Sequence, residues 1–375
     1  MNKRVYLSPP DLSDSELIVK SLEKIVESGW VGANGHSLTE FEELLRAYTS
    51  SNQVLCLNSG TSSLHIALKL VGVKKGDIVV CPTFTYVATV NAIKYLEAEA
   101  VFVDCELDTW AINSEDLFQA IETLIKKNKK PKAIVIVDNY GMPFKVEKIQ
   151  EITNHYDIPL IEDAAAALGS KYKHRSCGTL ADLGVFSFNE NKLITTGSGG
   201  GLILKTLEQY QKALYWATQA KTEAPFYLHH QVGYNYRMSA LGASLGMVQL
   251  RSIDTLLSKR KTHHQFYKDL TQDFPLEIQT NPNGDFDSNF WLNCLVLTNR
   301  KYQIEALIKR FNHQNIETRR LWYPMHNQPV FKHHDYFGQN NSDYLFNNGL
   351  CMPSGSSLND DTKERIKAVL VQFFS

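Results

Sequence analysis

The fold class follows first from residues 77–105, which read DIVVCPTFTYVATVNAIKYLEAEAVFVDC. Two short apolar runs, at 77–81 and 100–105, have the length of buried strands. Between them the apolar residues recur at helical spacing from Tyr86 to Leu96, which predicts a helix. Strands that are joined by a helix form a βαβ unit, in which the two strands run parallel.

The same alternation continues on both sides of this unit. Further strands are predicted at 54–57, 133–138, 158–164, 184–188 and 201–204. Further helices are predicted at 13–30, 38–48, 61–71, 113–126 and 146–156. In the first helix, Ser13 and Glu16 have the spacing of a capping box. We therefore expect an α/β fold with a mostly parallel sheet that helices cover on both faces.

The pattern changes after Thr206, where the alternation stops. A long helical region at about 239–274 is followed by a strand at 291–297, the helix QIEALIKRF and a C-terminal helix. A chain of 375 residues is also longer than one hydrophobic core usually supports. We expect a large α/β domain over 1–245 and a smaller α+β domain over 246–375.

Composition disfavours several classes of protein. The formal net charge is −1, whereas a protein that reads nucleic acid usually presents a basic face. The basic run KKNKKPK at 126–132 is interpreted as a solvated loop. No signal peptide is recognisable, and no apolar stretch approaches the ~20 residues that span a bilayer. The expectation is a cytosolic protein that binds neither nucleic acid nor membrane.

The cysteines do not indicate a metal site. They are widely spaced, they form no CxxC pair, and they are Cys56, Cys81, Cys105, Cys177, Cys294 and Cys351. Several lie in apolar runs, where a thiol packs as a small hydrophobic group. This usage is typical of a reducing compartment and argues against zinc.

A candidate phosphate site follows the strand at 54–57, because ligands of open α/β sheets bind at the carboxyl ends of strands. The sequence NSGTS opens the next helix. Gly60 permits a tight turn, and the amides of Thr61 and Ser62 point out of a helix N-terminus, where a phosphate can bind. An ordinary helix cap without a ligand is the simpler explanation of this motif taken alone.

Four more candidate groups follow predicted strands. Asp163 ends one strand, and the alanines after it leave room for a flat molecule. Tyr86 follows a second strand, and Ser187 and Lys192 follow a third. Taken separately, these residues could be a helix cap, a core aromatic residue or a solvated charge.

Together the groups supply the parts that hold pyridoxal phosphate. The phosphate needs helix amides and a hydroxyl such as that of Ser187, and the ring needs a flat face. The ring nitrogen needs an anion, and the aldehyde needs an amine for a Schiff base. The small residues Gly197–Gly201 would let the backbone approach a bulky group attached to Lys192. A dinucleotide fingerprint is excluded, because these glycines lack the G-x-G-x-x-G spacing and a strand follows them.

Six motifs occur in one order along the chain: NSGTSSLHIAL, PTFTYVATVNAI, LIEDAAAALGS, FSFNENKLITTGSGGG, GYNYRMSALGAS and IETRRLWYPMH. Through them the chain resembles, over nearly its whole length, the nucleotide-sugar aminotransferases of the DegT/DnrJ/EryC1/StrS group, which have the aspartate-aminotransferase type I fold. Three further segments, YLSPPDLS, NENKLITT and CMPSGSS, carry a narrower resemblance. It is to enzymes that aminate C4 of UDP-linked 4-keto-6-deoxy-N-acetylhexosamines in bacterial polysaccharide and glycan pathways.

The resemblance implies roles in holding the cofactor. Lys192 matches the Schiff-base lysine, and Asp163 matches the partner of the ring nitrogen. Ser187 matches a phosphate ligand, as do Thr61 and Ser62. Tyr86 matches the aromatic residue that stacks on the ring.

Other matches concern the substrate and a second subunit. Asn235 matches an asparagine that reaches the phosphate from the neighbouring subunit, which implies a homodimer with shared active sites. His326 matches a residue in a loop near the sugar, and Lys221 matches a contact to the nucleotide diphosphate.

Three departures from the family pattern stand out. Ala166 occupies a position where many relatives carry a side chain that hydrogen-bonds the cofactor's phenolic oxygen. Ser198 replaces an acidic residue in the usual TGEGG. Phe290 stands where close relatives often have arginine, which leaves the nucleotide preference open.

The expected reaction is a ping-pong transfer of an amino group from glutamate to a nucleotide-linked 4-keto-6-deoxy sugar, with UDP and C4 preferred. Lys192 would move the proton as general base and acid. The alternatives are a sugar 3-aminotransferase or dehydratase of the same fold, or a regulatory protein that binds pyridoxal phosphate without catalysis. A dehydratase of this fold replaces the lysine with histidine, so Lys192 argues against it.

Overall fold

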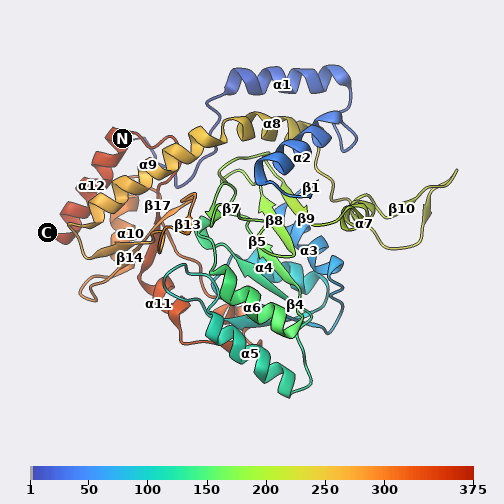
Figure 1. The fold of residues 1–375 in the computed structure, drawn as a ribbon. Coiled ribbons are helices and arrows are strands. Elements are labelled where there is room, and N and C mark those ends of the chain that lie inside the picture. The colour runs from blue at the N-terminus through green and yellow to red at the C-terminus, as the bar shows by residue number, and fades with distance from the viewer. Residues whose placement is uncertain (1–2) are drawn as a thin grey trace.

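The computed structural model describes residues 3–375 and is built around an eight-stranded sheet (Figure 1). The strands in spatial order are β1 (Gln53–Leu57), β9 (Gly200–Leu204), β8 (Leu183–Ser187), β5 (Leu160–Asp163), β4 (Ala133–Val137), β2 (Ile78–Pro82), β3 (Glu99–Val103) and β16 (Tyr336–Phe337). From β8 to β16 every neighbouring pair is parallel, and only β9 is antiparallel to both neighbours. The mostly parallel sheet and its predicted strands are confirmed, with ends that differ by at most two residues.

Helices cover both faces of this sheet, as its near-continuous burial requires. One face packs against α2 (His36–Thr49), α5 (Ser114–Lys126), α6 (Val146–Tyr156) and α8 (Ala240–Arg251). The other face packs against α3 (Gly60–Leu70), α4 (Val87–Tyr95) and α7 (Leu207–Ala217). The helix between β2 and β3, expected from residues 77–105, is therefore the crossover of a parallel βαβ unit.

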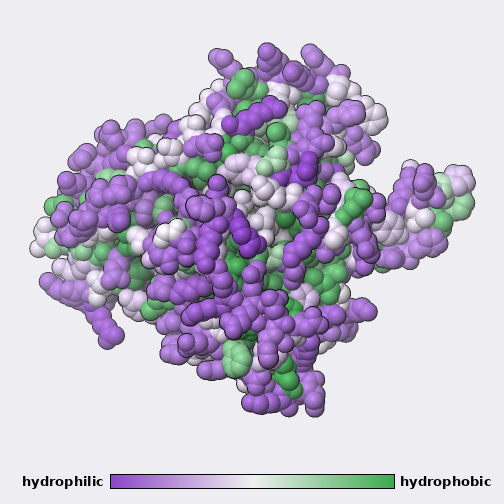
Figure 2. Space-filling view, in the orientation of Figure 1, coloured by the Kyte–Doolittle hydropathy of each residue, from purple (hydrophilic) through white to green (hydrophobic). Residues whose placement is uncertain are grey.

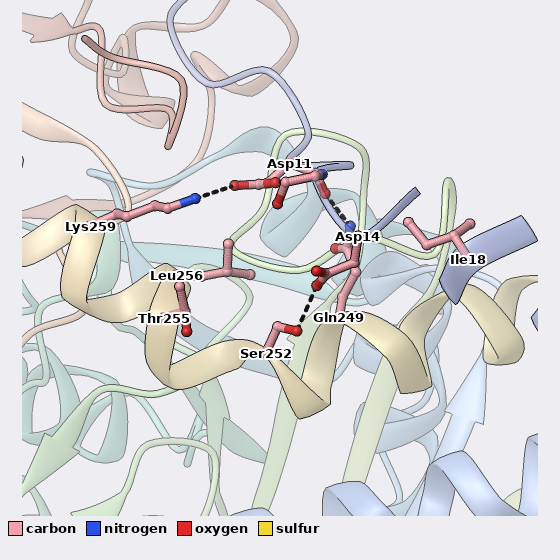
Figure 3. Close-up of a pocket in the computed structure, with 9 residues that line it drawn as sticks. Asp11, Asp14, Ile18, Gln249, Ser252, Thr255, Leu256 and Lys259 are labelled. Atoms are coloured by element: carbon pink, nitrogen blue, oxygen red, sulfur yellow. Dashed lines mark hydrogen bonds and ion pairs between the residues drawn. The ribbon is translucent and has the colours of Figure 1, made fainter. Parts of the chain in front are cut away.

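The first helix, α1 (Ser15–Ser28), starts differently from the sequence prediction. Asp14 is its N-cap and makes no side-chain capping bond, so the predicted capping box is wrong. The reason is a competing set of contacts, two of which reach the helical region at residues 240–271 (Figure 3). The Ser13 amide donates to Asp11, Asp11 pairs with Lys259 at 3.3 Å, and the Ser252 hydroxyl donates to Asp14 at 2.6 Å.

The C-terminal part has its own sheet and core. Its strands are, in order, β12 (Leu276–Ile278), β14 (Asn293–Leu297), β17 (Gly349–Met352) and β15 (Arg319–Arg320). Its helices are α9 (Ile253–Thr271), α10 (Ile304–His313), α11 (Asn341–Asn348) and α12 (Asp360–Phe374). The helical region expected at 239–274 is broken between α8 and α9 at Ser252. The boundary predicted at residue 245 falls inside α8 and stays a prediction.

Smaller elements complete the fold. A third sheet joins β13 (Phe286–Asp287) to β6 (Lys171–Tyr172) and β7 (Arg175–Ser176). The 3₁₀ helices are η1 (Asn139–Gly141), η2 (Met325–Asn327) and η3 (Pro329–Phe331). Within residues 3–375, none of the helices combines the length and the apolar character needed to cross a membrane.

One hairpin leaves the body of the molecule. It pairs β10 (Lys221–Thr222) with β11 (Leu228–His229) and projects beyond α7 (Figure 1). Apolar groups gather near its tip (Figure 2), where Phe226 and Tyr227 are 64% and 83% exposed, and Val232, three residues beyond β11, is 78% exposed.

Candidate active site

A cavity of about 910 Å³ opens at the carboxyl ends of β4, β5 and β8. Asp163, Ser187 and Lys192 line it from the large sheet, while Trp291 and Trp322 line it from the C-terminal part. The structure therefore brings several of the predicted groups together at the edge of the sheet where such sites form.

Asp163 sits at the inner end of this cavity as the last residue of β5. Its carboxylate accepts hydrogen bonds from the Thr89 hydroxyl at 2.8 Å and from the Ala165 amide at 3.2 Å. Burial raises the pKa of Asp163, and these two bonds and the charge of Lys192 act in the opposite direction. A cationic group placed beside Asp163 would favour its ionised form.

Lys192 lies on the loop between β8 and β9, and its amine belongs to a half-buried side chain that lines the cavity. Burial lowers the pKa of this amine to about 8, against a raising effect of Asp163. The nitrogen lies 4.0 Å from the centre of the Trp291 ring. An amine with this pKa loses its proton readily near neutral pH, as a proton-transferring group must.

The small residues after Lys192 allow close packing rather than direct contact with the lysine. A Cβ at Gly200 would lie 2.4 Å from the backbone of Ser59, so β9 approaches the start of α3 only because this residue is glycine. Gly60 is similarly tight, with a Cβ there 3.1 Å from that of Ser187.

The N-terminus of α3 opens into the cavity through Ser59, Gly60 and Thr61. Ser59 caps the helix by accepting the Ser62 amide at 3.0 Å. The Ser62 hydroxyl donates to Asn58 at 2.7 Å, and Ser62 does not line the cavity. Helix amides favour an anion at such an end, so this corner is the candidate phosphate site.

Tyr86 and Thr89 place two different groups at the start of α4. Tyr86 is the N-cap, lines the cavity and is 61% exposed, so its ring is available for stacking. Thr89 binds Asp163 from the first turn of the same helix. Sequence reasoning missed Thr89, although its position three residues after Tyr86 puts both on one helix face.

Besides Ser62, three predicted residues lie outside this cavity. His326 contacts Thr83 at 2.7 Å and Asp343 at 3.3 Å, with its ring stacked on Tyr336. Lys221 lies on the projecting hairpin, beside the ring of Tyr227. Asn235 is exposed beyond that hairpin, and its carbonyl accepts from Asn58. Their predicted roles stay predictions.

The departures from the family pattern have distinct surroundings. Ala166 lines the cavity with a methyl group, and its carbonyl accepts from Asn289. The Ser198 hydroxyl donates to the carbonyl of Asn58. Phe290 does not line the cavity and stacks on His264 with ring centres 3.6 Å apart.

The aromatic wall of the cavity was also missed. Tyr140 stacks on Trp322 with ring centres 4.3 Å apart, and on its other side it faces Trp291. Tyr140 follows β4, whereas the two tryptophans come from segments more than 150 residues later. No local pattern signals such a wall, because it forms only when the two parts of the chain meet.

Comparison with known proteins agrees with this geometry. The model of the DegT/DnrJ/EryC1/StrS aminotransferase family matches residues 13–371. EpsN of Bacillus subtilis is 36% identical, covering 100% of this chain and 97% of that protein. A GDP-perosamine synthase of Escherichia coli O157:H7 is 32% identical, covering 100% and 99%.

Two further similarities are informative. The UDP-4-amino-4,6-dideoxy-N-acetyl-beta-L-altrosamine transaminase of Campylobacter jejuni (strain 81-176) is 33% identical over 68% of this chain and 66% of that protein. The solved structure of Spr1654 from Streptococcus pneumoniae in its PLP form has a TM-score of 0.89 at 25% identity, covering 100% of both chains.

Proposed function

The chain belongs to the DegT/DnrJ/EryC1/StrS aminotransferase family, and from this premise we propose that it transfers an amino group from glutamate to a nucleotide-linked 4-keto-6-deoxy sugar. The observation that carries the proposal is the half-buried Lys192, which lines the same cavity as Asp163 and whose pKa is lowered by burial. Lysine and carboxylate are the pair that this chemistry needs.

Pyridoxal phosphate is the cofactor of this family, and the residues present fit it. The α3 N-terminus and Ser187 would hold the phosphate, and Tyr86 would stack on the ring. Asp163 would pair with the ring nitrogen, and Lys192 would bind the aldehyde. When bound, the cofactor withdraws electrons from the carbon that loses a proton.

The chain's own groups then account for proton movement. Lys192 takes the proton from the α carbon of the amino donor on its Nζ and returns one when the sugar is aminated. Its pKa of about 8 keeps a useful fraction of the amine neutral at neutral pH. Thr89 and the Ala165 amide orient the Asp163 carboxylate.

The identity of the nucleotide and the position of the aminated carbon in the substrate are more specific proposals. The narrower sequence resemblance favours UDP and C4, and the similarity to the C. jejuni transaminase supports that choice, whereas the similarity to GDP-perosamine synthase favours GDP. Phe290 weighs little here, because it is buried against His264 away from the cavity. We propose UDP and C4.

The test uses purified protein with glutamate and each of the UDP-, GDP- and dTDP-linked 4-keto sugars. Mass spectrometry of the products should detect the amine with the UDP-linked sugar, and the position of the nitrogen is then read by NMR. Lys192→Ala and Lys192→Arg should abolish turnover and the visible absorbance of the bound cofactor. An active, coloured Lys192→Ala protein would refute the assignment of the lysine.

We also propose that the active protein is a homodimer in which the hairpin of one subunit serves the cavity of the other. The apolar tip of β10–β11 lacks a partner within residues 3–375, and Lys221 and Asn235 lie on this segment away from the chain's own cavity. Lys192→Ala and Asn235→Ala variants would each impair turnover. Mixed under conditions that exchange subunits, they should regain activity, because hybrids contain one intact site; no recovery would contradict shared sites.

A further inference from the structure

The surroundings of Lys192 contain an aromatic partner that the proposed roles do not use. Its Nζ lies 4.0 Å from the ring centre of Trp291, inside the range of a cation–π contact. Within residues 3–375, this nitrogen donates no hydrogen bond, and the Asp163 carboxylate accepts from Thr89 and Ala165. The face of the indole is a close polarisable surface for the amine.

Trp291 is held firmly in this orientation. Its Nε1 donates to the carbonyl of Asn191 at 2.7 Å, and its amide donates to Asn289 at 2.8 Å. The first bond ties the indole to Asn191, the residue beside Lys192. On the side of the aromatic wall, the ring lies nearly parallel to Tyr140, at 17°.

We propose that the indole face of Trp291 holds the amino group of Lys192 whenever that group is not bonded to the cofactor, which makes Trp291 a positioning residue for proton transfer. The inference rests on the proposed aminotransferase function, in which the lysine alternates between a bonded and a free state. A free amine in an open cavity needs a defined position, or it would sample many rotamers before each proton transfer.

The contact also has an electrostatic consequence. A ring face stabilises an ammonium and not a neutral amine, so Trp291 favours the proton-carrying form of Lys192. Asp163 acts in the same direction, and burial acts against both. The other titratable or charged side chains that line the cavity are Tyr6, Tyr86, Asp138, Tyr140, Glu190, Glu317, Arg319, Arg320 and Cys351.

The test measures the protonation of Lys192 in the full-length protein prepared without cofactor. Acetylation of Lys192 by a small anhydride is followed by mass spectrometry across pH, in wild type, Trp291→Leu and Trp291→Phe. We expect the apparent pKa to fall by roughly 0.4 to 1.5 units in Trp291→Leu, and less in Trp291→Phe, which keeps a weaker ring. Well below the pKa, this shift corresponds to an increase of roughly 2.5- to 30-fold in neutral amine.

Trp322→Leu is the matched control. It removes an indole from the same aromatic wall, on the far side of Tyr140, and should leave the pKa of Lys192 unchanged. The full pH profile is needed because a smaller side chain also lets the reagent in faster, which raises the rate without moving the midpoint. An unchanged midpoint in folded Trp291→Leu would overturn the inference.

A second measurement leaves Trp291 in place. In protein labelled with 5-fluorotryptophan, the fluorine resonance missing from Trp291→Phe identifies Trp291. It should shift with pH in wild type, near the pKa of Lys192, and stay constant in Lys192→Met. A resonance that titrates equally in both proteins would contradict the contact. Because neither measurement needs turnover, they remain decisive even if glutamate and keto sugars prove not to be substrates.

Discussion

Two cations of this protein have opposite surroundings. Arg237, beside β1, is 9% exposed and is bound by the carboxylate of Glu42, which is 7% exposed, and by the carbonyl of Cys56. Lys192 lines the cavity and is half-buried, and its amine has no hydrogen-bond acceptor among residues 3–375. The charge of Arg237 is matched by hydrogen-bond acceptors, and the charge of Lys192 is not.

The pKa values of the two groups follow from this difference. Burial lowers the pKa of Arg237, but the hydrogen-bonded Glu42 outweighs it, so the pKa of Arg237 is raised. For Lys192, burial prevails over Asp163 and lowers the pKa to about 8. A cation that is paired with a carboxylate keeps its proton and has a structural role. A cation without such a partner loses its proton more easily, which suits a group that must exchange a proton.

The largest effect is expected from breaking the matched pair. Arg237→Met leaves the Glu42 carboxylate buried with the Cys56 amide and, at 3.5 Å, the Tyr210 hydroxyl as its donors, which should lower the free energy of unfolding by about 3–5 kcal/mol. Urea unfolding followed by circular dichroism measures this loss. In the control Glu42→Leu/Arg237→Met, no charge remains buried, so the loss should be smaller; an equal loss would show that packing dominates.

Removing the unmatched charge of Lys192 should instead raise the free energy of unfolding. In cofactor-free protein, the folded-state pKa of Lys192 lies below its unfolded value of 10.5, so the folded state binds fewer protons. The resulting cost is full below pH 8 and disappears as pH rises towards 10.5. Lys192→Met should therefore stabilise the protein at pH 7 by up to about 3 kcal/mol, and by less at pH 10.

Urea unfolding at both pH values measures this gain. Lys205→Met is the control, because Lys205 is 54% exposed in its pair with Asp182. This substitution should leave the free energy of unfolding unchanged at both pH values. A Lys192→Met protein that is less stable than wild type at pH 7 would mean that the amine is already matched by groups other than those described.

A smaller effect is expected from the group that orients Asp163. Thr89→Val removes a hydrogen bond that lowers the pKa of Asp163, so this pKa should rise further. Less carboxylate would then be available to pair with a protonated ring nitrogen. We expect cofactor affinity at pH 7 to fall about tenfold, as for one hydrogen bond to a charged group.

The pH dependence tests the cause. The deficit of Thr89→Val should shrink as pH is raised, because Asp163 then ionises without the hydroxyl. Thr89→Ser keeps the donor and should bind the cofactor nearly as wild type does. Equal weakening in both variants, at every pH, would mean that the methyl group matters more than the hydrogen bond. Equilibrium dialysis or fluorescence titration gives the affinities.

The matched and unmatched cations differ in how far sequence could reveal them. The βαβ alternation predicted the strand ends, and therefore the positions of Asp163 and Lys192, because strand and helix periods are local properties. The candidate groups at the strand ends indicated the cofactor, and the resemblance agreed with it. Neither revealed Thr89 or Trp291, since what these residues contact depends on packing between elements that are distant in sequence.

Local patterns failed where tertiary contacts compete with them. The capping box expected at Ser13 and Glu16 did not form, because Asp11 takes the Ser13 amide and Ser252 takes Asp14. The Arg237–Glu42 pair joins residues 195 positions apart, so no sequence period marks it. Short-range periodicity in the sequence therefore predicts the fold class, whereas the electrostatics of the site depend on long-range contacts.

The smallest effect on stability is expected at an exposed ion pair. Such a pair tests whether burial or a short distance between the charges determines the effect. Lys75 and Glu97 lie 2.6 Å apart, yet their side chains are 77% and 66% exposed. Water screens such a pair, and ordering two long side chains offsets its attraction. Lys75→Ala should leave the urea midpoint unchanged within error, at low and at high salt. A clear salt-dependent loss would show that proximity alone stabilises pairs in this protein, and the contrast between Arg237 and Lys192 would then need a cause other than burial.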